Sequence, residues 1–139
     1  MDYTRFGDTV VVRLDKGDEI TETLKAVAAK EKITCGSITG IGATDAFSVG
    51  VFDLTKKKYN VFEYTQNHEI NALTGNLTTM NGGTYLHVHI TCTDQAGKVV
   101  GGHLLKGVIS LTGEIFITVV NGIVDRTHDD ALGINRLSF

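Results

Sequence analysis

The most regular alternation of polar and apolar residues along this chain lies between Tyr85 and Cys92. The polar set is Tyr85, His87, His89 and Thr91, and the apolar set is Leu86, Val88, Ile90 and Cys92. A period of two is typical of a β-strand that packs one face against the core. We therefore predict a strand from whose opposite face both histidines project together.

A short turn joins this strand to a further histidine. The segment from Asp94 to Lys98 fits a three-residue hairpin loop in which Gly97 is left-handed and Asp94 pairs with Lys98. This register places His103 opposite His89, on the same face, with His87 as the diagonal neighbour. Opposed residues have Cβ atoms about 5 Å apart and diagonal ones about 7 Å apart, so the three imidazoles can converge on one ion.

The sequence therefore predicts a divalent-metal site made by His87, His89 and His103. The alternative is a polar patch, or a subunit interface held by histidine hydrogen bonds, and a one-residue slip of the hairpin would move His103 to the other face. Three neutral imidazoles favour Zn²⁺, with Fe, Ni, Co or Mn as alternatives. A fourth position would then hold water or a small-molecule ligand.

The remaining pattern predicts one helix and many strands. Thr9 to Leu14 reads as a strand, and a helix capped by Asp18 follows, with its apolar residues on one face: Ile20, Leu24, Val27 and Ala28. Strands are expected at 35–41, 45–53, 58–65, 69–79, 84–94, 98–105 and 114–124. The predicted fold is α+β, a curved and mainly antiparallel sheet with one principal covering helix.

We interpret several other sequence features as structural rather than functional. Gly40 to Asp45 is interpreted as a turn rather than as part of a dinucleotide-binding loop. His128 to Asp130 could add metal ligands, but a charged and frayed tail is the expected structure. Cys35 and Cys92 are expected to be buried thiols. A general base beside a metal-bound water would come from a strand carboxylate, and the candidates are Glu63, Glu69 and Glu114.

Composition restricts the class of protein. The 139 residues are 42% apolar and 21% charged, which is typical of one globular domain spanning 1–139. Thirteen basic against sixteen acidic residues give a net charge of −3 without a basic cluster, which disfavours direct nucleic-acid binding. No apolar run is long enough to cross a membrane, and the N-terminus lacks a secretory signal, which indicates a cytoplasmic protein.

Five segments spread over nearly the whole chain resemble the PPC domain, a domain of plants and prokaryotes that in plants is joined to AT-hook DNA-binding segments. They are Arg13 with Gly17-Asp18, Ser37 to Ala43, Leu73 to Asn76, His87 to His89, and Gly101 to Gly107. The resemblance implies a curved antiparallel sheet, a homotrimer, and metal-type positions at His87, His89 and His103. The Arg-Gly-Arg-Pro core of an AT-hook is absent from this proline-free chain, so the resemblance is to the stand-alone prokaryotic type.

Three functions are compatible with these features. The first is a small PPC-like protein that binds a divalent metal and has an unidentified biochemical role. The second is a DNA-associated or transcription-regulatory module that acts through assembly with other proteins. The third is a metal-dependent hydrolase or lyase of a small molecule, which would need an additional acid or base.

Overall fold

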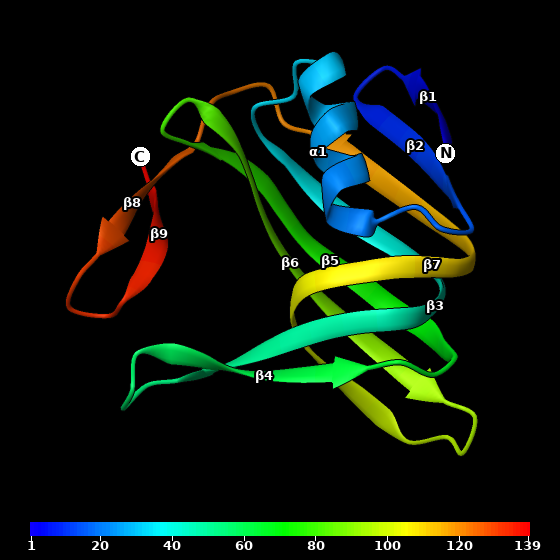
Figure 1. The fold of residues 1–139 in the computed structure, drawn as a ribbon. Helices are drawn as coiled ribbons and strands as arrows, with labels where there is room; N and C mark the ends of the chain where they lie inside the picture. Colours follow the sequence, from blue (N-terminus) through cyan, green and yellow to red (C-terminus); the bar gives the residue numbers. More distant parts are fainter.

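The computed structural model describes residues 1–139, which form nine strands and one helix (Figure 1). The elements are β1 (Asp2–Phe6), β2 (Thr9–Asp15), α1 (Ile20–Lys30), β3 (Gly36–Asp53), β4 (Lys58–Tyr64), β5 (His68–Met80), β6 (Gly83–Asp94), β7 (Val99–Val119), β8 (Asp125–Asp129) and β9 (Ile134–Ser138). All strand pairings are antiparallel, which confirms the predicted α+β class. No helix has the length and apolar character that crossing a membrane would require.

The two longest strands, β3 and β7, pair along most of their length and organise the sheet (Figure 1). The other edge of β7 pairs first with β6 and then with β2, and the other edge of β3 pairs first with β5 and then with β4. Because β5 and β6 also pair, the strands β3, β5, β6 and β7 close into a ring. The predicted curvature of the sheet is confirmed.

Helix α1 lies against β6 and β7 and covers the apolar interior of the sheet (Figure 1). Its buried residues are the four of the predicted apolar face: Ile20, Leu24, Val27 and Ala28. The prediction that Asp18 caps the helix is wrong. The cap is Glu19, whose Oε2 accepts from the Glu22 amide at 2.7 Å, while the Asp18 carboxylate accepts from the Asp15 amide at 2.8 Å. The Oε1 of Glu19 also accepts from the Gly107 amide at 2.9 Å, which ties the helix to β7.

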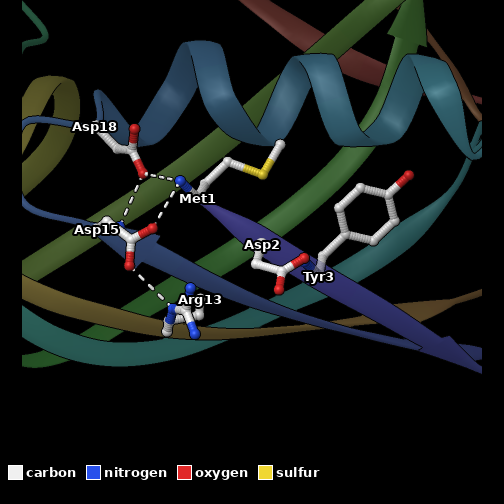
Figure 2. A network of polar contacts seen from close by, with 6 residues as sticks. All are labelled: Met1, Asp2, Tyr3, Arg13, Asp15 and Asp18. Atoms are coloured by element: carbon white, nitrogen blue, oxygen red, sulfur yellow. Dashed lines mark hydrogen bonds and ion pairs between the residues drawn. The ribbon is translucent and has the colours of Figure 1, made fainter.

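Two acidic residues, Asp15 at the end of β2 and Asp18 beyond it, hold the start of β1 in place (Figure 2). The amino group of Met1 lies 2.9 Å from the Asp15 carboxylate and 3.0 Å from that of Asp18. Asp15 also accepts from Nε of Arg13 at 2.9 Å. The hydrogen bonds from the Met1 amino group and from Arg13 lower the pKa of Asp15. Water screens exposed ion pairs of this kind, so they orient the strand more than they stabilise it.

At two places where the sequence predicts a gap between two strands, the strand is continuous. Gly40 to Asp45 is not a turn but part of β3, where the register with β5 and β7 shifts and the strand bends. A bulge lets a strand curve without ending, so the expected strands 35–41 and 45–53 are one element. The expected strands 98–105 and 114–124 are likewise joined in β7. Strand β1 and the hairpin of β8 and β9 were not predicted.

Candidate metal centre

The hairpin between β6 and β7 sets the positions of the candidate ligands. Gly97 has a φ of 80°, and the Asp94 amide donates to the Lys98 carbonyl at 3.0 Å. The Asp94 carboxylate accepts from the amides of Ala96 and Lys98, both at 2.9 Å, and these backbone hydrogen bonds lower its pKa. The predicted register is confirmed, because His89 lies opposite His103.

The three histidine rings form a nearly equilateral triangle. The ring centroids of His87 and His89 are 5.3 Å apart, those of His87 and His103 are 5.1 Å apart, and those of His89 and His103 are 5.5 Å apart. One ring nitrogen from each lies within 4.8 Å of the others. A tetrahedral ion bound at about 2.1 Å needs nitrogens about 3.4 Å apart, which modest side-chain rotations can provide.

His103 carries the clearest unsatisfied group of the site. It is half-buried, and its Nδ1 is a buried atom without a hydrogen-bond partner. Burial, followed by the charges of His87 and His89, lowers the pKa of His103 to about 4. Burial, followed by the charges of Arg126 and His89, lowers the pKa of His87. Both imidazoles are therefore neutral near pH 7, and the neutral form is the one that binds a metal ion.

Tyr59 of β4 supports the His103 ring. The two rings stack with centroids 5.0 Å apart and an angle of 19° between their planes. The stack depends on Gly50, which lies opposite His103 in β3, because a Cβ there would come within 2.5 Å of the Tyr59 ring. Partial burial, followed by the neighbouring Tyr85, raises the pKa of Tyr59. No periodic pattern in the sequence around Tyr59 singles this residue out.

Arg126 of β8 lies beside the site, where β5 pairs with β6. Its guanidinium donates to Oγ1 of Thr78 at 2.9 Å, to the carbonyl of Asn135 at 2.9 Å and to Oδ1 of Asn76 at 2.8 Å. It also lies over the Tyr85 ring, 4.6 Å from the centroid. Sequence reasoning missed this residue because the C-terminal segment was expected to be frayed.

That expectation is wrong, because residues 125–138 form a paired hairpin. His128 bonds through Nδ1 to Oδ1 of Asn135 at 2.9 Å and lies 3.5 Å from Asp130, so it is part of the hairpin and not of the histidine cluster. The candidate bases are on exposed positions of β4, β5 and β7 and outside the cluster; they are Glu63, Glu69 and Glu114.

The two cysteines are free thiols. Cys92 is buried, and burial raises its pKa to about 12. Cys35 is only half-buried, so the expectation of two buried thiols is confirmed for Cys92 alone.

The family model of the Plants and Prokaryotes Conserved (PCC) domain matches residues 1–121 of this chain. Three solved structures are similar over nearly their whole length. A "putative DNA binding protein" of Bacteroides thetaiotaomicron is 32% identical, with 99% of this chain and 96% of that chain covered and a TM-score of 0.96. A metal-containing protein of Archaeoglobus fulgidus is 25% identical, with 100% and 99% covered and a TM-score of 0.90. A plant- and prokaryote-conserved (PPC) protein of Pyrococcus horikoshii is 26% identical, with 97% and 93% covered and a TM-score of 0.84. No curated protein matches the sequence.

Proposed function

This chain belongs to the Plants and Prokaryotes Conserved domain family, and we propose that it binds one divalent metal ion through His87, His89 and His103. The observation that carries the proposal is the convergence of three ring nitrogens within 4.8 Å, one of the three rings having a buried and unpaired Nδ1. An unpaired buried polar atom is costly, and coordination of an ion by Nδ1 would remove that cost. The name of the metal-containing relative from Archaeoglobus fulgidus adds support.

Zn²⁺ suits the donor set best, since three neutral imidazoles and one open position are the ligands of many catalytic zinc sites. Fe, Ni, Co and Mn remain the alternatives. His89 is exposed and borders an open hollow whose other lining residues are Thr74, Gly75, Asn76 and His87. A bound zinc ion would supply a Lewis acid there, accessible to a small molecule from the solvent.

Elemental analysis of protein purified without a polyhistidine tag tests the proposal. We expect about one metal ion per chain, and the His103→Ala variant should lose it while remaining folded. His128→Ala is the matched control, because His128 is an exposed histidine outside the cluster. Folded wild-type protein that contains no metal and takes up no added Zn²⁺, Co²⁺ or Fe²⁺ would contradict the proposal.

A second candidate function is that of a DNA-associated module that acts through assembly. It is favoured by the relative that is called a "putative DNA binding protein". The net charge of −3 disfavours direct contact with DNA phosphates. A gel shift at low and moderate salt tests this function, and only sequence-dependent binding that persists at moderate salt would support it.

A homotrimer is the assembly that we expect. Val99 and Leu105 of β7 are 62% and 38% exposed, and burial against a second copy would remove these apolar side chains from water. Sedimentation velocity at micromolar concentration measures the mass directly. A single species of the monomer mass would contradict the trimer without affecting the metal proposal.

A further inference from the structure

We propose that the metal centre takes a small oxyanion, of the carboxylate or phosphate class, and that Arg126 is the residue that recognises its charge. The inference rests on the metal site proposed above and adds the class of ligand. It is carried by the position of a buried guanidinium beside the histidine cluster and by the charge of the groups around it.

Arg126 is a buried cation whose hydrogen-bond acceptors are all neutral. The residue is 5% exposed, and its side chain donates to a hydroxyl, an amide oxygen and a backbone carbonyl. None of the ion pairs of the chain involves it. A buried charge without a countercharge is expensive, and burial strengthens its attraction for an anion. The stack on Tyr85 offsets part of the cost but supplies no negative charge.

The guanidinium lies on the same face of the sheet as the candidate ligands. Asn76, which accepts from Nη2 of Arg126, is directly opposite His87 in the pairing of β5 with β6. Thr78, which accepts from Nε, is directly opposite Tyr85, two residues before His87. Opposed residues on one face have Cβ atoms about 5 Å apart, so Arg126 borders the site at its His87 side.

The charges at the site sum to a positive value. No carboxylate belongs to the histidine cluster or lines the hollow beside it, and the cation Arg126 borders the cluster through Asn76. With a dication bound by neutral imidazoles, the ion contributes +2 and Arg126 contributes +1, a total of +3. A site of this charge favours an anion over a neutral ligand.

The hydrogen-bonding capacity of Arg126 is also suited to an oxyanion. A guanidinium has five N–H donors, of which the structure pairs three, one on each nitrogen. One donor remains on Nη1 and one on Nη2, and planar donor pairs are the usual partners of carboxylate and phosphate oxygens.

Arg126 lies outside the part of the chain that the family model matches. The family model covers residues 1–121, and Arg126 lies in the hairpin of β8 and β9 that follows (Figure 1). The hairpin is held against β5 by the bonds from Arg126 to Thr78 and Asn76, and against β6 by the Asn135 amide, which donates to the Tyr85 hydroxyl at 3.3 Å. The C-terminal hairpin is therefore the element that selects the ligand of the metal site.

Titration of the Co²⁺-loaded full-length chain with acetate, inorganic phosphate and the neutral analogue acetamide tests the inference. The visible absorption of Co²⁺ reports on ligands that enter its coordination sphere, and free metal is removed beforehand. We expect saturable spectral changes with acetate or phosphate, and whichever of the two binds more tightly identifies the class. Acetamide should bind at least tenfold more weakly than the better anion.

Arg126→Gln should weaken binding of the better anion by about tenfold or more, as expected for the loss of a charge-assisted hydrogen bond, and leave Co²⁺ stoichiometry unchanged. Arg126→Lys keeps the charge and should lose less affinity. Arg136→Gln is the matched control on the same hairpin, because Arg136 is exposed and paired with Asp129 at 2.8 Å.

The outcomes separate the two proposals. Failure of folded protein to bind Co²⁺ would overturn the proposed function and this inference with it. Normal Co²⁺ binding with equal anion affinity in Arg126→Gln and wild type would overturn the inference alone. If Arg126→Gln does not fold, the wild type decides, because acetamide binding as tightly as the better anion would also overturn the role of charge.

Discussion

The substitution His103→Phe should have opposite effects on stability with and without metal. In the metal-free protein, phenylalanine removes the buried and unpaired Nδ1 and keeps an aromatic ring against Tyr59. An unsatisfied buried polar atom costs about 1–3 kcal/mol, and the lower end, about 1 kcal/mol, applies because His103 is only half-buried. The metal-free variant should therefore be more stable than wild type, with a Tm about 3 °C higher.

Zn²⁺ should reverse this order of stability between wild type and the variant. A ligand at a hundredfold excess over its Kd adds about 2.7 kcal/mol to the free energy of unfolding. The variant lacks one of the three candidate ligands and gains none of this stabilisation by Zn²⁺. Wild type should then be the more stable protein by about 2 kcal/mol, the difference between the two effects.

Urea denaturation of chelator-treated and Zn²⁺-saturated protein measures both orders. His128→Phe is the control, because His128 is exposed and outside the cluster, and it should leave the response to Zn²⁺ unchanged. A metal-free His103→Phe protein that is less stable than wild type would refute the cost assigned to Nδ1. A wild-type protein whose free energy of unfolding is the same with and without Zn²⁺ would refute the claim that metal binding stabilises the fold.

Three further outcomes follow from the same structure. The pKa of His103 in the folded protein, about 4, lies below the usual value near 6.5, so the folded state binds fewer protons than the unfolded state between these values. The metal-free protein should therefore lose stability as pH falls from about 6.5 to about 4, and His103→Phe should show a smaller loss in urea denaturation. Gly50→Ala places a Cβ within 2.5 Å of the Tyr59 ring, and it should cost about 1–3 kcal/mol and weaken metal binding, whereas Gly122→Ala, with open space at its Cβ, should change neither. Glu19→Ala removes the cap of α1 and the bond to Gly107, and thermal unfolding should show a loss of about 1–2 kcal/mol, while Glu22→Ala should cost less.

The histidine cluster could be predicted from the sequence because its determinants are local. Strict alternation from Tyr85 to Cys92 fixes the face of His87 and His89, and the loop ending at Gly97 fixes the register that brings His103 opposite His89. A two-residue period and a short turn act over a few residues and do not depend on the rest of the fold.

The predictions that are wrong concern features that tertiary contacts determine. Asp18 and Glu19 are adjacent acidic residues, and the choice of Glu19 as the cap depends on the distant Gly107 amide that it also accepts from. The C-terminal hairpin is ordered because Arg126 is buried against Thr78 and Asn76, residues 48 and 50 positions away. Nothing in the local sequence of residues 125–138 specifies these partners.

X-ray absorption at the metal edge of untagged, metal-loaded protein tests the central claim most directly. The three-histidine site predicts a first shell of three imidazole nitrogens at about 2.0–2.1 Å for zinc, with one oxygen ligand from water, and loss of one imidazole in His103→Ala. A first shell that contains sulfur, or one of oxygen atoms alone, would contradict the site.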